Sequence, residues 1–248
     1  MELSLVMLGT GSAFARKYYN NNALITCNGY NLMLDCGHTA PRALDELGIG
    51  LQTIDGIFVS HLHADHTGGL EEIAFRMKYT YQQKPTLFVP EDLIDTLWNH
   101  SLRGNLENVS ENLRSLDDFF VVVPVKAGVP LIVTEGLEIE TVRTRHIPNK
   151  PSYGVFLNGF VYFSADSLVD ADLLERLVAC GCRHILHDCQ LKKPEHIHAT
   201  LDSLLTLPET IQKKTLLMHY DDDMENYVGR TGSMTFIRQH ETYRFARE

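Results

Sequence analysis

The sequence predicts an α/β fold, in which two mixed β-sheets pack face to face between outer layers of helices as an αββα sandwich. Apolar runs with strand character alternate with segments of helical spacing along the whole chain. These segments fall into two rough halves, each of which combines strands with covering helices. Neither a linker nor a low-complexity segment divides the chain, so we expect one domain over residues 1–248.

In the first half, apolar spacing predicts strands at 3–8, 22–27, 30–36, 54–60, 86–90 and 119–125, and helices at 40–47 and 70–81. Asn28-Gly29 joins two of these strands in a hairpin, because this dipeptide favours the tight turn of paired strands. The run IDGIFVS is almost entirely apolar, which is typical of a strand covered on both faces. Leu70, Ile73, Ala74 and Met77 share one face of the second helix.

The second half repeats this plan, with strands predicted at 137–144, 153–157, 160–166, 183–189 and 214–220, and helices at 171–181 and 199–208. Asn158-Gly159 marks a second hairpin. Gly9 and Gly11, near the start of the chain, raise the question of a dinucleotide-binding loop. The third glycine that such a loop requires is replaced by Phe14, so these glycines favour a tight backbone turn instead.

Charge and hydropathy exclude two classes of partner. The chain has 32 acidic and 22 basic side chains, a formal net charge of −10, and its longest basic cluster is a pair such as Lys192-Lys193. Proteins that grip long nucleic acids need a basic stripe, because phosphate contacts supply most of the affinity. No apolar run approaches the ~20 residues that span a bilayer. We therefore expect neither a long nucleic acid nor a membrane as partner.

The start of the chain and its cysteines indicate the compartment. The first residues, MELSLVMLGTGSAF, lack the basic region that opens a signal peptide, so we expect a cytoplasmic protein. The five cysteines are odd in number and form no CxxC pair. This pattern argues against a disulfide framework, as expected in a reducing compartment.

The densest group of functional residues follows the strand at 54–60 and reads HLHADH. His61 and His63 are two positions apart and project to the same side of an extended backbone. Asp65 and His66 follow in the turn and aim at a neighbouring point. Imidazole and carboxylate ligands suit zinc, manganese or iron, and the majority of imidazoles favours zinc. This segment therefore predicts a metal site.

Three later residues also stand at strand ends: His146, Asp166 and His219. Each of them alone could be a polar strand cap. A catalytic pair of metals needs roughly seven ligands, one of which bridges the two ions. Together with HLHADH these three residues complete such a set, with Asp166 between the metals. We expect two Zn²⁺ ions, with Mn²⁺ as an alternative.

This combination resembles the metallo-β-lactamase superfamily over nearly the whole chain, which implies the metallo-β-lactamase fold. Finer motifs resemble the branch of tRNase Z and related phosphodiesterases: LGTGSAF at the start, HIPNKPSYGVF at 146–156, SADS at 164–167, HDCQ at 187–190 and HAT at 198–200. HDCQ stands where that branch has His-Glu-Ala-Thr, and HAT where it has His-Ser-Thr. The resemblance implies that His61, His63 and His146 hold one metal, that Asp65, His66 and His219 hold the other, and that Asp166 bridges them.

The resemblance also implies the catalytic residues Asp65, His198 and Asp188. His198 would protonate the leaving oxygen, and a histidine with a pKa near the working pH suits this task. Asp188 would be its carboxylate partner, although the branch has a glutamate there. His196 is close enough in sequence to compete with His198, but the Ala-Thr that follows favours His198.

Spacing bears on the substrate. The tRNA-processing members of this branch carry a basic arm between the third histidine and the bridging aspartate. Here His146 and Asp166 are 20 positions apart, and a predicted hairpin fills the interval. The missing arm and the acidic net charge argue against tRNA.

The start LGTGSAFARKYYNNNALI and the segments HDCQ and MHYDDD look like the anti-Pycsar phosphodiesterases. That resemblance implies hydrolysis of cyclic nucleoside monophosphates, including cyclic CMP and cyclic UMP, to linear nucleotides, which removes an antiphage signal. It also implies a homodimer, in which residues 71–115 pack against the partner or reach into its site; a self-contained helical layer is the alternative. Tyr153 and Phe14 are candidates for stacking on the base in an apolar slot.

Three other functions remain open. The protein could be a tRNase Z-like endoribonuclease, a metallo-hydrolase of a non-phosphate substrate, or a binding protein that retains the fold. The predicted acid His198 argues against lactam or thioester hydrolysis, because those reactions do not call for it. The complete set of seven ligands argues against a site that has lost its activity.

Overall fold

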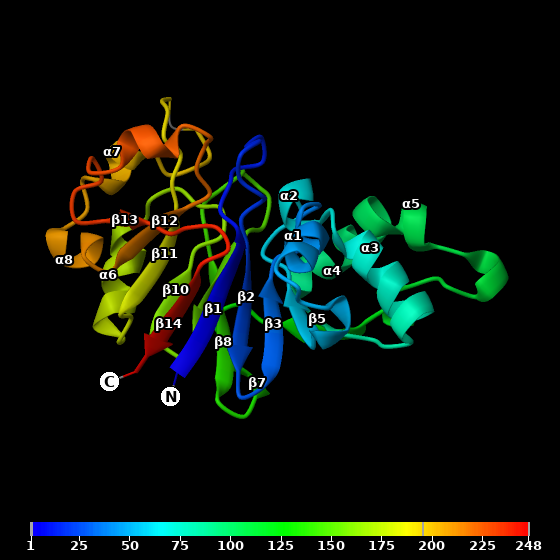
Figure 1. Ribbon diagram of the computed structural model, residues 1–248. Helices are drawn as coiled ribbons and strands as arrows, with labels where there is room; N and C mark the ends of the chain where they lie inside the picture. Colours follow the sequence, from blue (N-terminus) through cyan, green and yellow to red (C-terminus); the bar gives the residue numbers. More distant parts are fainter. Residues whose placement is uncertain (1, 195, 248) are drawn as a thin grey trace.

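The computed structural model describes residues 2–194 and 196–247. Two seven-stranded sheets pack face to face, and the helices lie on their outer sides (Figure 1). The αββα sandwich predicted from the sequence is therefore confirmed. That the chain is one domain stays a prediction. In the described part of the chain, no helix is long and apolar enough to cross a membrane.

The first sheet has the strand order β14-β1-β2-β3-β4-β5-β6. Its strands are β1 (Glu2–Gly9), β2 (Asn22–Cys27), β3 (Tyr30–Leu34), β4 (Gly56–Phe58), β5 (Thr86–Pro90), β6 (Val121–Val125) and β14 (Thr242–Ala246). The strands from β14 to β3 pair antiparallel, and those from β3 to β6 pair parallel. Because β14 pairs with β1, the last strand of the chain returns to the first sheet.

The second sheet has the order β13-β12-β11-β10-β9-β8-β7. Its strands are β7 (Leu131–Thr134), β8 (Leu137–Arg143), β9 (Tyr153–Leu157), β10 (Val161–Phe163), β11 (His184–Asp188), β12 (Thr215–Met218) and β13 (Thr235–Phe236). Pairing is antiparallel from β7 to β10 and parallel from β10 to β13. The two sheets thus share one topology, in which β3, β4 and β5 correspond to β10, β11 and β12.

Helices divide between the two outer sides (Figure 1). Those from the first half are α1 (Ala40–Glu46), α2 (Ala64–Thr67), α3 (Leu70–Phe75), α4 (Ile94–Leu97) and α5 (Arg103–Leu106), and those from the second are α6 (Ala171–Ala179), α7 (Leu201–Leu204) and α8 (Glu209–Gln212). The 3₁₀-helices are η1 (Leu51–Thr53), η3 (Glu91–Leu93), η5 (Val109–Glu111), η6 (Leu116–Asp118) and η7 (Met224–Tyr227), and the π-helices are η2 (Arg76–Tyr81) and η4 (Trp98–Leu102). Residues 70–115, here called the helical lobe, extend away from the sandwich in Figure 1.

Alternating burial builds the core between the sheets. Leu3, Leu5 and Met7 of β1 are fully buried, whereas the residues between them are partly exposed. All three residues of β4 are buried, as expected for a strand covered on both faces. Both predicted hairpins are present, and Asn28 and Asn158 take the left-handed backbone that their tight turns require, with φ of 49° and 52°.

Two predicted helices differ in the structure. The segment 70–81 is α-helical only to Phe75 and continues as the π-helix η2, although the predicted face of Leu70, Ile73, Ala74 and Met77 is buried. The helix predicted at 199–208 is reduced to α7, which Thr200 caps by accepting a hydrogen bond from the Ser203 nitrogen. Pro208 has no N–H to continue this helix and stands instead directly before α8.

Three strands were not predicted: β7, β13 and β14. All lie at sheet edges, where one face is open to solvent and the apolar signal is weak. In β14, for example, Phe245 is the buried residue, and its neighbours are partly or fully exposed. β13 has two residues, too few for a period of two to be visible in the sequence.

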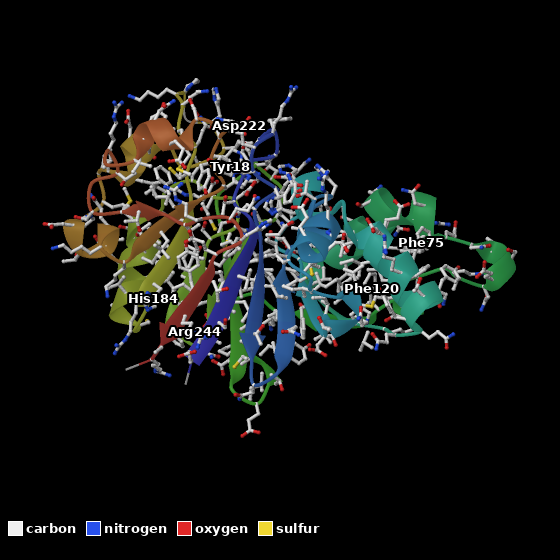
Figure 2. The ribbon with its side chains drawn as sticks, in the orientation of Figure 1. Tyr18, Phe75, Phe120, His184, Asp222 and Arg244 are labelled. Carbon is white, nitrogen blue, oxygen red and sulfur yellow. The ribbon has the colours of Figure 1, made fainter. Side chains whose placement is uncertain are left out.

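The loop between β1 and β2 is fastened to the segment after β12. Asp222 Oδ1 accepts hydrogen bonds from the backbone nitrogens of Arg16 and Lys17, both at 2.8 Å. Figure 2 shows Tyr18 of this loop beside Asp222, at the end of the sandwich away from the chain termini. At Gly9, the last residue of β1, the backbone passes close to this loop: a Cβ atom would lie 2.2 Å from the Asn20 backbone oxygen, so only glycine fits.

Candidate metal centre

HLHADH occupies the loop after β4 and the short helix α2, which lies at the end of the sandwich opposite the termini (Figure 1). The loop after β3 presses against it. A Cβ atom on Gly37 would lie 2.0 Å from the Asp65 carbonyl oxygen, so glycine is required for this approach. The Asn22 side chain joins the two loops, accepting from the Gly37 nitrogen at 2.8 Å and donating to the Asp65 carbonyl at 3.3 Å.

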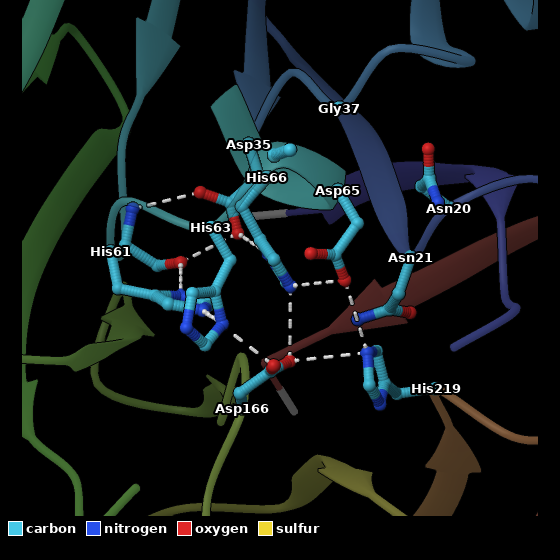
Figure 3. Close-up of polar contacts among 12 residues, drawn as sticks. Asn20, Asn21, Asp35, Gly37, His61, His63, Asp65, His66, Asp166 and His219 are labelled. Atoms are coloured by element: carbon cyan, nitrogen blue, oxygen red, sulfur yellow. Dashed lines mark hydrogen bonds and ion pairs between the residues drawn. The ribbon is translucent and has the colours of Figure 1, made fainter. Parts of the chain in front are cut away.

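A first cluster of candidate ligands contains three imidazoles and one carboxylate: His61, His63, His146 and Asp166. His63 Nδ1 lies 3.1 Å from His61 Nε2 and 3.3 Å from His146 Nε2. Asp166 Oδ2 lies 3.6 Å from the Nε2 atoms of both His61 and His146. The four ligand atoms all lie within 4.8 Å of one another. Figure 3 shows three of these side chains, His61, His63 and Asp166.

A second cluster shares the same aspartate and contains Asp65, His66, Asp166 and His219. Here the other oxygen of Asp166, Oδ1, lies 3.1 Å from His66 Nε2 and 3.4 Å from His219 Nε2. Asp65 Oδ2 lies 3.2 Å and 3.5 Å from the same two nitrogens. Asp166 thus directs one oxygen to each cluster, which is the arrangement of a bridging ligand (Figure 3).

The donor set fits two metal ions. With bonds of about 2.0–2.1 Å, ligand atoms around a tetrahedral metal are ~3.3 Å apart, close to the spacing of both clusters. His66 Nε2 and Asp166 Oδ1 are buried and, although they lie 3.1 Å apart, make no hydrogen bond with each other or with any other described residue. The side chain of Asn21 is fully buried beside this region and equally without a partner. Buried polar atoms without partners call for an ion or a water.

A buried carboxylate that the sequence analysis missed, Asp35, supports ligands of both clusters. Its Oδ2 lies 2.8 Å from His66 Nδ1 and accepts a hydrogen bond from the Ser60 hydroxyl at 2.7 Å. The Ser60 oxygen lies in turn 3.0 Å from His61 Nδ1. Asp35 therefore orients one imidazole directly and another through Ser60, which leaves both Nε2 atoms for a metal.

Two more imidazoles, those of His146 and His219, are oriented in the same way. His146 Nδ1 lies 2.8 Å from the Ile197 carbonyl oxygen, and His219 Nδ1 lies 3.2 Å from Asp188 Oδ1. Such outer partners fix the tautomer of a metal-binding histidine and the direction of its ring. The backbone contributes as well, because Asp35, Ala165 and His219 take left-handed conformations with φ of 62°, 49° and 59°. Non-glycine residues of this kind cluster at functional sites.

His198 lies beside both clusters. Its ring centroid is 4.9 Å from that of His146 and 4.8 Å from that of His219. Its Nδ1 lies 2.8 Å from Asp188 Oδ2, so one carboxylate serves both His198 and His219. The same side chains form a third group of possible ligands with Asp166, but Asp188 already engages Nδ1 of His198. Asp188 thus reaches His198, although the branch that the chain resembles has the longer glutamate at this position.

Burial and charge set the protonation of these groups. Burial lowers the pKa of His61 and His63, which favours the neutral imidazole that a metal binds. Burial opposes the charged form of His66 and His219 too, but nearby carboxylates, Asp166 foremost, outweigh it and raise the pKa of both. Metal binding at the second cluster must therefore displace protons. Burial also opposes the charged form of His198, but the Asp188 carboxylate outweighs this effect and raises the pKa of His198.

A cavity of about 290 Å³ opens beside the first cluster. It lies between HLHADH, the loop after β5 and the segment after His146, and is here called the side cavity. Tyr153, expected to stack on a base, is not among its lining residues: the ring is 3% exposed and lies in β9. Phe14, the other candidate, is 92% exposed in the loop after β1 and does not line the side cavity either. Substrate binding by these two residues stays a prediction.

The structure brings all seven expected metal ligands together and places His198 and Asp188 beside them. His196, the competitor of His198, is exposed. The sequence analysis missed Asp35 and Ser60, and also Asp92, which lines the side cavity. A signal existed for Asp35: like Asp166, it follows the second strand of a hairpin that contains an Asn-Gly turn, Asp35 directly and Asp166 three positions after the strand.

Comparison with known proteins gives one family. The model of the family described as anti-Pycsar protein Apyc1 matches residues 3–243. An anti-Pycsar protein Apyc1 from Paenibacillus xerothermodurans is 52% identical over 246 residues, covering 99% of this chain and 98% of that protein.

Solved structures establish the fold. The metallo-β-lactamase fold protein YhfI from Bacillus subtilis is 14% identical, with a TM-score of 0.76 over 99% of this chain and 100% of its own. The short form of human tRNase Z is 19% identical, with a TM-score of 0.69 over 97% of this chain and 98% of its own. The expected metallo-β-lactamase fold is therefore confirmed, as is the likeness to tRNase Z.

Replacing Asp35 should weaken metal binding without removing a ligand. Asp35→Asn keeps the size of the side chain but loses the charge that orients His66 and, through Ser60, His61. Outer-shell changes of this kind typically lower metal affinity about 10–100-fold. Competition with a chromophoric chelator would measure the affinity, and Asp45→Asn, at an exposed aspartate outside both clusters, is the matched control. Equal affinities for the two variants would contradict this role.

Proposed function

The chain belongs to the anti-Pycsar Apyc1 family, and from this premise we propose that it hydrolyses cyclic nucleoside monophosphates to linear nucleotides. Cyclic CMP and cyclic UMP would be among the substrates, and their loss would silence an antiphage signal. The protein has the fold of a metallo-hydrolase and a buried histidine and aspartate centre. The observation that carries the proposal is the His198–Asp188 pair set against that centre, which provides an acid for a leaving alkoxide.

Each residue of the centre has a role in this proposal. Two Zn²⁺ ions, or Mn²⁺ in their place, would be held by His61, His63, His146 and Asp166 and by Asp65, His66, Asp166 and His219. Bound metals of this kind lower the pKa of water and balance the charge of a phosphoryl group. Asp188 engages Nδ1 of His198, so Nε2 is the atom that can give a proton to the departing ribose oxygen. Burial opposes the charged imidazole, but Asp188 outweighs it and raises the pKa of His198, so this imidazole keeps its proton to a higher pH than an ordinary histidine.

Size and charge support a small substrate. The side cavity, of about 290 Å³, lies at the lower end of the range for small-molecule sites and suits one nucleoside. The interval from His146 to Asp166 is occupied by β9, its turn and β10, so no basic arm extends from it. The protein's net charge of −10 disfavours a long RNA, because phosphate contacts with basic side chains supply most of the affinity for such a partner.

We also place the protein in the cytoplasm. All five cysteines are free, and four of them are buried, which suits a reducing compartment.

As in the sequence analysis, we propose a homodimer in which the helical lobe contacts the partner. Tyr79 and Val109 of this lobe are large apolar side chains that are 51% and 64% exposed. A second copy would remove them from water. Light scattering of the 28.1 kDa chain should give about twice that mass at assay concentration, and a monomer would contradict the proposal.

Product analysis tests the substrate. Protein loaded with zinc or manganese should convert cyclic CMP, cyclic UMP, cyclic AMP and cyclic GMP to linear monophosphates, as followed by liquid chromatography. His61→Ala should abolish the conversion, because it removes a ligand of the first metal cluster. Intact cyclic nucleotides with a trimmed precursor tRNA would indicate an endoribonuclease instead. Turnover of nitrocefin but not of phosphodiesters would indicate a non-phosphate substrate.

The role of His198 can be separated from metal binding by the leaving group. His198→Ala should keep both metals and lower turnover of cyclic nucleotides by about 10²–10⁴-fold, the usual contribution of a general acid. Turnover of bis-p-nitrophenyl phosphate, whose leaving group departs without a proton, should fall far less in this variant. His196→Ala, two positions away and exposed, is the control. Loss of metal from His198→Ala would make His198 a ligand, and equal losses on both substrates would remove its acid role.

A further inference from the structure

The side cavity contains a carboxylate that the metal centre does not use. Asp92 lines this cavity together with His61 and His146 of the first metal cluster. It belongs to η3, directly after β5. Because β5 corresponds in topology to β12, the loop that carries Asp92 is the counterpart of the loop that carries His219. Both loops leave the carboxyl ends of parallel strands, which is where ligands bind in α/β proteins.

Two neighbouring side chains, Tyr153 and Arg143, hold the Asp92 carboxylate in place. The Tyr153 hydroxyl donates a hydrogen bond to Asp92 Oδ2 at 2.8 Å, and Arg143 Nη1 lies 3.7 Å from the same oxygen. The Arg143 guanidinium also lies over the Tyr153 ring, 5.8 Å from its centroid. Burial first, and Asp92 second, raise the pKa of Tyr153 to about 12, so its hydroxyl stays a donor. Tyr153 thus positions a carboxylate at the wall of the side cavity.

This carboxylate is suited to one part of a nucleotide. An ionised carboxylate only accepts hydrogen bonds, and its two oxygens offer about four sites. It would repel the cyclic phosphate, which the metals attract. It would attract an N–H or O–H group, which the base and the ribose supply. Leu93, Ile147 and Pro151 line the same cavity and offer apolar surface to the rest of the nucleoside.

We propose that Asp92 recognises the nucleoside, its carboxylate accepting a hydrogen bond from a donor on the substrate. The donor is either an exocyclic amino group of the base or the ribose 2′-hydroxyl. Tyr153 and Arg143 are positioning residues that act through Asp92. This inference rests on the proposed function and extends it, because it assigns the nucleoside half of the substrate to the side cavity.

The test compares substrates with and without a nucleoside. Asp92→Asn should lower kcat/KM for cyclic nucleotides about tenfold more than for bis-p-nitrophenyl phosphate, which has no base or ribose. Tyr153→Phe should also lower kcat/KM more for cyclic nucleotides than for bis-p-nitrophenyl phosphate, but by a smaller factor, because it keeps the Asp92 carboxylate and removes only the hydroxyl that holds it. Glu91→Gln is the matched control: it removes the same charge from the same turn, at an exposed side chain outside the side cavity.

Two patterns would support the proposal and identify the donor. If Asp92 accepts a hydrogen bond from an exocyclic amino group, Asp92→Asn should change the ratio of kcat/KM for cyclic CMP to kcat/KM for cyclic UMP. If Asp92 accepts a hydrogen bond from the 2′-hydroxyl, Asp92→Asn should lower kcat/KM equally for the cyclic nucleotides of all four bases. For 2′-deoxy analogues, which lack that donor, the variant should have the same kcat/KM as the wild type. An equal loss on nucleotides and on bis-p-nitrophenyl phosphate, or no loss, would overturn the proposal.

The experiment also separates this inference from the proposed function. A wild-type protein that opens no cyclic nucleotide overturns the proposed function and this inference with it. If the wild-type protein opens them, but Asp92→Asn leaves unchanged the ratio of kcat/KM for cyclic nucleotides to kcat/KM for bis-p-nitrophenyl phosphate, this inference alone is overturned.

Discussion

The structure depends on the burial of negative charge at one end of the sandwich. Asp35, Asp65, Asp166 and Asp188 are all at most 5% exposed and are linked through shared histidines. Removing a carboxylate from water is costly unless cations or donors replace the lost hydration. Burial by itself opposes the ionised form of Asp65 and Asp166. The neighbouring imidazoles outweigh burial and hold the pKa of both carboxyls below the ordinary range, so they supply part of this compensation. The need for cations makes this cluster a metal centre.

The sheets meet that requirement through a repeated topology. The loops after β3 and β4 supply Asp35 and HLHADH. The loops after β10 and β12 supply Asp166 and His219, and Asp188 at the end of β11 pairs with His198 from the loop that follows. Side chains far apart in sequence converge because parallel strands end at the same edge. Left-handed backbone at Asp35, Ala165 and His219 shows that the chain accepts local strain to aim these groups.

Local patterns in the sequence predicted most of this centre. HLHADH combines close spacing with a preceding apolar strand, and His146, Asp166 and His219 stand at the ends of predicted strands. The resemblance then assigned each ligand to one of the two metals. Asp35 was missed because one carboxylate after a strand has the pattern of an ordinary strand cap. Asp92 was missed because its partner Tyr153 lies 61 positions away and meets it only in the folded chain. The sequence also does not show that strand β9, which carries Tyr153, is buried along its whole length.

The shared topology has a consequence for how such a chain can be divided. Each metal cluster takes two ligands from the first half of the chain and two from the second, with Asp166 counted in both. Neither half carries a complete set for even one ion. A half-length polypeptide could therefore build such a centre only by associating with the other half. In the intact chain both halves are joined by the backbone, so the two sets of ligands are always present together.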